Sequence, residues 1–295
     1  MTPPPVPRFD GFLRVGGLPL HVRVDGDGPV CVLSAGLGLA WFDWDPVVPY
    51  LAPHRTVVRF DRPGHGLSAP AGRGPGAYGA LAEADRIAGI LDALRLPPGP
   101  VTVAGHSIAA FHAEAFARRH PERTAALVLV DGSTEEHPPA DPAPALHEAA
   151  ARLAGRALTA TGLPAAAGPL LRRAAVRAAR TGGPDPAPRA LVRRCYRTGR
   201  VWQGALLENA HYARTAAELL RLRETRPLTA PATVLAAYDG SGRPGALRWQ
   251  ARQAALARTL GARFDTAEPA GHLVMADRPH QVARTILAAP HASAP

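Results

Sequence analysis

Ser107 has the sequence surroundings of a nucleophile. It lies in Gly105-His-Ser-Ile-Ala109, after the apolar run Val101–Ala104 and before an alanine-rich segment with helical spacing. A tight turn between a buried strand and a helix lifts a serine hydroxyl clear of the backbone. The free N–H groups at the start of the helix can then stabilise an oxyanion. The pattern therefore predicts a nucleophilic serine, with Ala109 where a glycine is usual.

His272 is the residue that we expect to activate this serine. It follows Gly271, after a predicted strand over 262–267 and before a predicted helix over 280–287. An imidazole with an ordinary pKa of about 6.5 can accept the serine proton and return it to a leaving group. The position of His272 after the last strand therefore predicts a general base.

A carboxylate is expected to orient this imidazole, and two candidates follow predicted strands. Asp239 comes after the strand over 232–237, and Asp131 ends the strand over 127–130. We expect Asp239 to be the acid, because the usual chain order places the acid late, between serine and histidine. Asp131 remains the alternative. The other carboxylate is then expected in a turn or as an anchor.

Ala35-Gly-Leu-Gly38 is a glycine-rich turn after a predicted buried strand over 30–34. It lacks the Lys-Ser/Thr pair of a phosphate-binding P-loop. Because it precedes the serine turn, we expect it to present a backbone N–H to an oxyanion. The predicted oxyanion hole is formed by the N–H groups of Leu37 and Ile108.

The elements that must position these residues alternate in type along the chain. Apolar patterning predicts strands over 9–15, 20–24, 30–34, 56–60, 101–104, 127–130, 232–237 and 262–267. It predicts helices over 81–94, 246–260 and 280–287, and a second helical group over 146–158, 170–180, 190–197 and 203–222. Strands that alternate with helices favour an α/β fold.

Four pieces of the sequence, in this order and spacing, resemble the α/β-hydrolase superfamily over residues 9–290. They are Asp61-Arg-Pro-Gly-His-Gly-Leu-Ser68, Gly105-His-Ser-Ile-Ala109, Ala125-Ala-Leu-Val-Leu-Val-Asp131 and Gly271-His272. The resemblance implies a mostly parallel central sheet flanked by helices, with an inserted helical cap. It also implies a triad in the order serine, acid, histidine, with no triad role for His65 or His106.

The resemblance sets the expected domain organisation. Residues 1–133 and 230–295 are expected to form the α/β-hydrolase core, and residues 134–229 the helical cap. The cap carries most of the chain's excess of arginine, which we interpret as a solvated helical surface. Four of its side chains are candidates either for lining a substrate pocket or for ordinary packing: Tyr196, Trp202, His211 and Tyr212.

The predicted reaction is acyl transfer to water through an acyl-enzyme on Ser107. We expect a serine hydrolase that acts on a small ester-like carbonyl substrate, of the carboxylesterase or lactonase type. Two alternatives stay open. One is a small-molecule-binding protein without hydrolytic activity on the same scaffold, and the other is a carbon–carbon bond hydrolase.

The composition limits the classes of partner that we expect for this chain. The formal net charge is +10, but all 34 basic residues are arginines scattered among acids, so nucleic-acid binding is not expected. No apolar run reaches the roughly 18 residues of a membrane span. Met1–Arg8 lacks the apolar core of a signal peptide, so we expect a cytoplasmic protein. A small-molecule substrate is the expected partner, with the chain as a monomer or homodimer.

No cofactor or metal is expected. Cys31 and Cys195 are the two cysteines, too few for a disulfide framework or a cysteine metal site. The chain also lacks an HExxH or comparable histidine pair.

Overall fold

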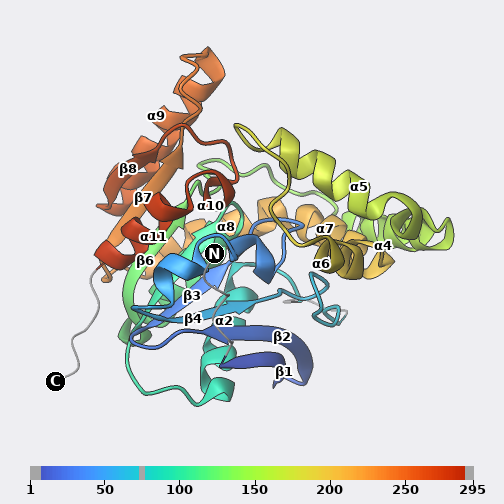
Figure 1. Ribbon diagram of the computed structural model, residues 1–295, viewed down its shortest axis with the longest axis horizontal. Helices are drawn as coiled ribbons and strands as arrows, with labels where there is room; N and C mark the ends of the chain where they lie inside the picture. The colour runs from blue at the N-terminus through green and yellow to red at the C-terminus, as the bar shows by residue number, and fades with distance from the viewer. Residues whose placement is uncertain (1–7, 73–76, 290–295) are drawn as a thin grey trace.

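The computed structural model describes residues 8–72 and 77–289 (Figure 1). Within them one eight-stranded sheet has the order β1-β2-β4-β3-β5-β6-β7-β8. The strands are β1 (Phe9–Val15), β2 (Leu18–Asp25), β3 (Val30–Ser34), β4 (Thr56–Phe60), β5 (Val101–His106), β6 (Thr124–Val130), β7 (Ala232–Ala237) and β8 (Arg263–Ala267). β1 pairs antiparallel with β2 and β2 with β4, and the other neighbours are parallel. The predicted α/β fold with a mostly parallel sheet is confirmed.

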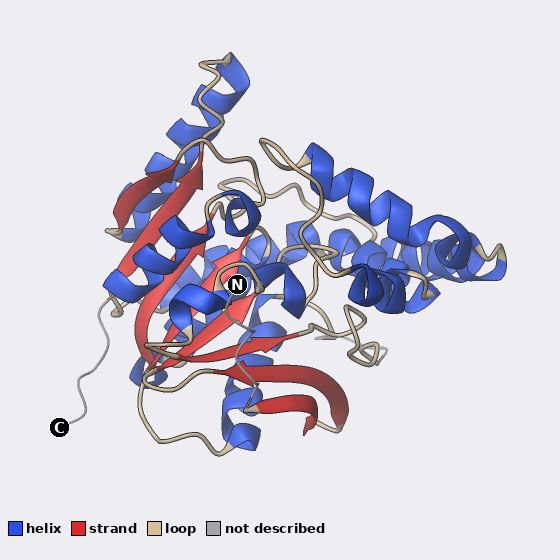
Figure 2. Cartoon of the chain, viewed as in Figure 1, coloured by secondary structure: helices blue, strands red, loops and turns tan. Residues whose placement is uncertain are grey.

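Helices cover both faces of this sheet (Figure 2). Those outside the β6–β7 segment are η1 (Trp41–Trp44), α1 (Val48–Leu51), α2 (Ala80–Leu94), α3 (Ala109–Arg119), η2 (Pro121–Arg123), α9 (Pro244–Leu260), α10 (Val274–Asp277) and α11 (Pro279–Ala288). Alternate residues of the central strands point to opposite faces: Val32 and Val103 pack with α2 and α3, whereas Leu33 and Ala104 pack with α1 and α11. Burial on both faces explains why these strands are continuous apolar runs.

The segment between β6 and β7 contains the second helical group. Its described helices are α4 (Pro144–Ala160), α5 (Leu163–Ala178), α6 (Arg189–Tyr196), α7 (Gly199–Ala210) and α8 (Tyr212–Thr225). The single helix predicted over 203–222 is wrong, because the chain turns at His211 and divides it into α7 and α8. Ala216 and Leu219 of α8 belong to the main core with α2 and α3. The cap boundaries at 134 and 229 stay a prediction.

α5 begins seven residues earlier than predicted, at Leu163 instead of residue 170. Pro164 lies in the first turn of the helix, where proline removes no needed N–H donor. Pro169 lies inside the helix, where a proline is expected to end one.

Across residues 8–72 and 77–289, no helix combines the length and the apolar character that crossing a membrane requires. The sequence-based interpretation of residues 1–7 lies outside the described residues.

Candidate active site

Ser107 occupies a strained turn between β5 and α3. Its φ is +56°, in the left-handed region that residues other than glycine rarely adopt. A Cβ at Gly105 would lie 2.2 Å from the carbonyl oxygen of Ala109, so only glycine allows strand and helix to approach this closely. Ala109 is fully buried and its methyl group is accommodated in the core. The turn therefore presents the Ser107 hydroxyl at the carboxyl edge of the sheet.

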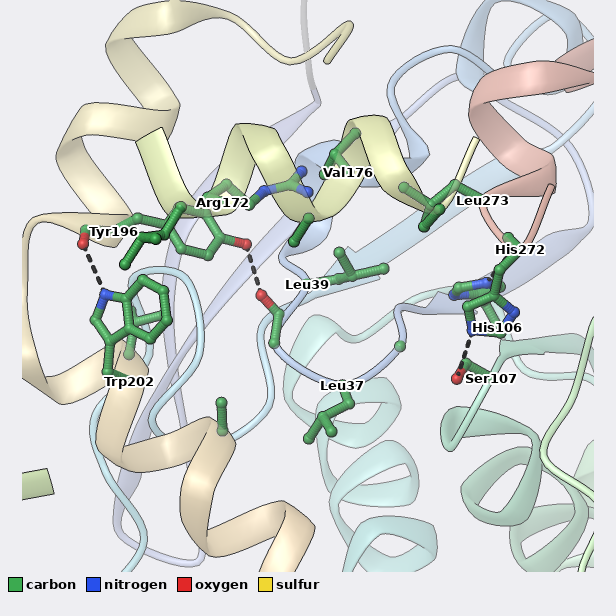
Figure 3. Close-up of a pocket in the computed structure, with 17 residues that line it drawn as sticks. Leu37, Leu39, His106, Ser107, Arg172, Val176, Tyr196, Trp202, His272 and Leu273 are labelled. Atoms are coloured by element: carbon green, nitrogen blue, oxygen red, sulfur yellow. Dashed lines mark hydrogen bonds between the residues drawn. The ribbon is translucent and has the colours of Figure 1, made fainter. Parts of the chain in front are cut away.

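His272 lies between Ser107 and Asp131. Its Nε2 is 3.0 Å from Ser107 Oγ, and its Nδ1 is 2.6 Å from Asp131 Oδ2 (Figure 3 shows the Ser107 contact). Because an ionised carboxylate only accepts hydrogen bonds, the contact with Asp131 places the proton of a neutral His272 on Nδ1. Nε2 is then free to accept the serine proton.

Asp131 is buried, and its second carboxylate oxygen is also held. Oδ1 accepts hydrogen bonds from the backbone N–H of Ala237 at 2.9 Å and from Trp249 Nε1 at 2.7 Å. The Asp131 side chain is 2% exposed, whereas that of His272 is 42% exposed. The carboxylate is thus fixed by hydrogen bonds on the side away from His272, and the imidazole stays accessible to solvent.

The expectation that Asp239 faces His272 is wrong. Asp239 is exposed, and its Oδ1 accepts the Ser241 N–H at 2.9 Å in a surface turn. This hydrogen bond lowers the pKa of Asp239. The backbone of Tyr238 bonds to Ala267 and Ala270, and Asp239 lies beyond this pairing in the exposed turn. Asp131 instead follows β6 directly, and β6 adjoins β5, the strand that leads to Ser107.

Ile108 directly follows the nucleophile, and the turn that carries Leu37 lies against it. A Cβ at Gly36 would lie 3.0 Å from Ser107 Cβ, so the turn that carries Leu37 packs directly on the serine. Ile108 immediately precedes α3. Within the described part of the chain, neither the Leu37 nor the Ile108 N–H has a hydrogen-bond partner. Their role in binding an oxyanion stays a prediction.

His106 supports the backbone of His272, a contact that sequence reasoning missed. Its Nε2 lies 2.8 Å from the His272 carbonyl oxygen, and the two rings are 4.7 Å apart. Burial, together with the nearby His272, lowers the pKa of His106 well below its usual value. A neutral His106 therefore donates its single proton to that carbonyl. The only sequence signal was its position next to Ser107.

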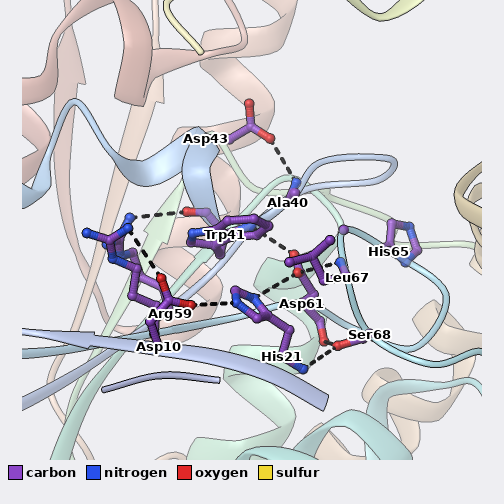
Figure 4. Close-up of polar contacts among 12 residues, drawn as sticks. Asp10, His21, Ala40, Trp41, Asp43, Arg59, Asp61, His65, Leu67 and Ser68 are labelled. Atoms are coloured by element: carbon purple, nitrogen blue, oxygen red, sulfur yellow. Dashed lines mark hydrogen bonds and ion pairs between the residues drawn. The ribbon is translucent and has the colours of Figure 1, made fainter. Parts of the chain in front are cut away.

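Asp61 ties the loop over 61–68 to the segment that follows the Leu37 turn (Figure 4). Its Oδ1 accepts the Trp41 N–H at 3.0 Å, and its Oδ2 accepts the Leu67 N–H at 2.9 Å. Ser68 Oγ donates to the Asp61 carbonyl and accepts the His21 N–H. The sequence indicated mainly a turn here, but the loop also positions η1, which follows the turn that carries Leu37.

A cavity of about 390 Å³ opens beside Ser107 and His272, beneath α5 and α7. Tyr196 and Trp202 line it, whereas His211 and Tyr212, the other two candidates, do not. Tyr196 donates its hydroxyl to the Gly38 carbonyl at 2.6 Å, and Trp202 Nε1 donates to the Tyr196 carbonyl at 2.9 Å. The remaining wall is mostly aliphatic: Leu37, Leu39, Leu171, Ala175, Val176, Ala179, Val201, Ala205 and Leu273.

Arg172 of α5 lies in the wall of this cavity, and two carboxylates flank it. It forms an ion pair with Asp43 and lies 3.8 Å from Asp185. Burial raises the pKa of Asp43 to about 6, although Arg172 opposes this shift. The guanidinium charge is therefore already matched within the protein.

A family model described as "Alpha/beta hydrolase family" matches residues 31–285. A 2-hydroxy-6-oxo-2,4-heptadienoate hydrolase of Pseudomonas putida is 37% identical over 123 residues, covering 40% of this chain and 43% of that protein. A pimeloyl-[acyl-carrier protein] methyl ester esterase of Klebsiella pneumoniae is 37% identical over 102 residues, or 35% and 36% of the two chains. The chain thus spans about two fifths of the length of the curated relatives that it matches.

Solved structures match over nearly the whole chain. An enol-lactonase from Burkholderia xenovorans LB400 superposes with a TM-score of 0.64 at 25% identity. The match covers 94% of this chain and 98% of the lactonase.

Proposed function

The chain belongs to the alpha/beta hydrolase family, and on this premise we propose that it is a serine hydrolase of neutral, apolar esters. One observation carries the proposal. Ser107 Oγ, His272 Nε2 and Nδ1, and Asp131 Oδ2 form a continuous chain of contacts of 3.0 and 2.6 Å at the mouth of an apolar cavity. This is the arrangement of a nucleophile, a general base and an orienting carboxylate.

The proposed reaction proceeds in two halves. His272 Nε2 takes the Ser107 proton while Oγ attacks the ester carbonyl carbon, and the N–H groups of Leu37 and Ile108 bind the oxyanion. Collapse of the resulting tetrahedral intermediate breaks the bond to the alcohol, and the alcohol takes the proton from His272 Nε2. Water then attacks the acyl-enzyme with His272 as its base, releasing the acid and restoring Ser107.

The residues that line the cavity favour a substrate with a neutral acyl group. Its aliphatic side chains favour methylene groups, each worth about 0.8 kcal/mol when buried. The heptadienoate named for the P. putida relative is a carboxylate. In this chain a substrate carboxylate would meet Arg172 already flanked by Asp43 and Asp185. An ester with an aliphatic acyl chain avoids that unfavourable desolvation of charge.

Labelling with a fluorophosphonate tests the nucleophile. We expect the wild type to be labelled and Ser107→Ala to lose both labelling and hydrolysis of p-nitrophenyl esters. Equal labelling of the two proteins would contradict the proposal.

A substrate panel separates the alternatives. The wild type is expected to hydrolyse p-nitrophenyl butyrate and longer esters faster than a diketone of similar size. Cleavage of the diketone alone would favour a carbon–carbon bond hydrolase. Saturable binding of esters without labelling or turnover would favour a binding protein.

A further inference from the structure

Helix α7 docks on the loop over 61–68 through one face. Arg200, Gly204 and Glu208 are four residues apart in turn, so they share that face. Arg200 donates to the carbonyls of Gly66 and Ser68. A Cβ at Gly204 would lie 2.9 Å from the carbonyl carbon of Gly64, so glycine permits close contact. The docking brings Glu208 to Arg62.

Arg62 connects Glu208 to the turn over residues 35–38, which carries the Leu37 N–H. Its Nε and Nη2 donate to the two carboxylate oxygens of Glu208 at 2.6 and 2.8 Å. On its other side, Nη2 donates to the Gly36 carbonyl at 2.8 Å and Nη1 donates to the Ala35 carbonyl. Both side chains of the ion pair are buried, at 2% and 7% exposure. One guanidinium thus holds two successive carbonyls of the turn.

These contacts fix the direction of the Leu37 N–H. In a trans peptide unit the C=O and N–H point in opposite directions. Because Arg62 holds the Gly36 carbonyl, the N–H of the same peptide unit, that of Leu37, points away from Arg62. The Leu39 N–H also bonds to this carbonyl at 3.1 Å, but it does not reach Ala35. Arg62 therefore orients both peptide units of the turn and draws their oxygens away from an oxyanion.

The Glu208 carboxylate is suited to hold this guanidinium. Burial alone would oppose its ionisation, but Arg62 and the neighbouring His65 lower the pKa of Glu208 to about 2. The ion pair is therefore ionised at neutral pH. A fork of two parallel hydrogen bonds also fixes the plane of the guanidinium, which a single contact would not.

We propose that Arg62, held by Glu208 of α7, is a positioning residue that locks the Gly36–Leu37 peptide in the orientation required of an oxyanion hole. The proposal rests on the proposed serine hydrolase activity. It makes the docking of α7 a condition for transition-state stabilisation and adds a function to the ion pair beyond holding α7 in place.

The test compares this ion pair with a matched one elsewhere. Arg223 of α8 donates two hydrogen bonds to the buried Glu114 of α3, at 2.8 and 2.7 Å. The variants are Glu208→Gln, the double variant Arg62→Met/Glu208→Gln, and the control Arg223→Met. The double variant removes one buried ion pair without leaving a lone charge, and the control leaves Glu114 paired with Arg118. We would measure Tm, kcat and KM on p-nitrophenyl butyrate, and inhibition by an alkyl trifluoromethyl ketone.

The ketone reports on the oxyanion hole. Ser107 Oγ bonds to its carbonyl carbon, His272 takes the serine proton, and the ketone oxygen becomes the oxyanion. Loss of one oxyanion donor costs about 100- to 1,000-fold in kcat. We expect the Arg62→Met/Glu208→Gln variant to lose about 100-fold in kcat and the same factor in ketone affinity. We expect Glu208→Gln to lose about 10-fold, with KM within about two-fold in both.

The control is expected to lower Tm while kcat and ketone affinity change by less than about two-fold. The proposal is overturned if Arg62→Met/Glu208→Gln lowers Tm but not kcat or ketone affinity, or if the control lowers kcat by as much.

A crystal structure of the Arg62→Met/Glu208→Gln variant separates this result from a failure of the proposed function. We expect the Gly36 carbonyl to point in a different direction from that in the wild type. If its direction is unchanged, the proposed role of Arg62 in orienting this peptide is wrong. If the wild type neither reacts with a fluorophosphonate nor hydrolyses esters, the proposed function is wrong. The orientation of this carbonyl in the variant then still tests whether Arg62 orients the Gly36–Leu37 peptide.

Discussion

Asp131 Oδ2 contacts His272 Nδ1 at 2.6 Å across 141 positions of the sequence. The contact is possible because Asp131 directly follows β6, the neighbour of the strand that leads to Ser107. The φ of Asp131 is +43°, so the chain turns sharply as soon as the strand ends. A buried carboxylate in this position can stabilise the imidazolium that forms when His272 takes a proton.

The first prediction concerns the identity of the acid. Replacing Asp131 with asparagine keeps its size but allows the amide to favour the wrong tautomer of His272. We expect Asp131→Asn to lower kcat by about 10,000-fold, because the same change of a triad acid to its amide has an effect of that size in a serine protease. Steady-state kinetics on p-nitrophenyl butyrate would measure it.

Asp239→Asn is the matched control. Its carboxylate is exposed and bonds to Ser241, so we expect kcat within about two-fold of the wild type. A large loss of kcat in Asp239→Asn, with an active Asp131→Asn protein, would contradict this assignment.

Trp249 provides a second test of the same carboxylate. Its Nε1 donates to Asp131 Oδ1 at 2.7 Å, beside the Ala237 N–H. Trp249→Phe removes this donor, at a cost of about 1.5–3 kcal/mol for a hydrogen bond to a charged group. We expect a loss of about 10-fold in kcat with little change in KM, because the looser carboxylate orients His272 less well. An unchanged kcat with a reduced unfolding free energy would show that the Ala237 N–H alone is sufficient to hold the Asp131 carboxylate for catalysis.

The order of elements and the serine turn were predictable because they depend on local patterns. Strands buried on both faces produce apolar runs such as 101–104 and 127–130. Gly105 and Ser107 lie at the point where β5 must turn into α3, and that requirement is local too. His272 was found for the same reason, since it follows the last strand.

The acid and the contacts that hold the turn over residues 35–38 could not be found in this way. Asp131 and Asp239 both follow strands, and the choice between them depends on how the backbone turns after β6 and β7. The contact between Arg62 and Glu208 joins residues 146 positions apart, on a loop and on a helix of the segment between β6 and β7. Such pairs are set by packing, and a single sequence contains no local pattern that identifies them.

His112 leads to a prediction about acid stability. It is 2% exposed in α3, and burial, reinforced by Arg62, lowers its pKa to about 3. An unfolded histidine has a pKa of about 6.5 and binds a proton as the pH falls, whereas the folded one does not until about pH 3. The stability contributed by neutral His112 is therefore complete above pH 6.5 and is lost as the pH falls to about 3. The slope is up to about 1.4 kcal/mol per pH unit.

His112→Gln removes this titration and is expected to make acid unfolding shallower. Urea unfolding at pH 9, 7.5, 6, 5 and 4 would give the difference in unfolding free energy between wild type and variant. Between pH 7.5 and 9 the difference is expected to be constant, which serves as the internal control. A difference that stays constant down to pH 4 would show that His112 is protonated in the folded protein.

The last prediction concerns the length of the acyl chain. Trp202 and Ser107 lie on opposite sides of the apolar cavity, with Leu37 and Leu39 between them (Figure 3). An acyl chain that extends from Ser107 along this cavity ends against the indole. Trp202→Ala lengthens the cavity, so two further methylene groups can be buried, worth about 0.8 kcal/mol each. The ratio of kcat/KM for a long to a short p-nitrophenyl ester is expected to rise about 10-fold, since 1.4 kcal/mol is one factor of ten. Tyr50→Ala, an exposed aromatic residue of α1 away from the cavity, should keep the wild-type profile. If Trp202→Ala also keeps that profile, the acyl chain leaves Ser107 in another direction.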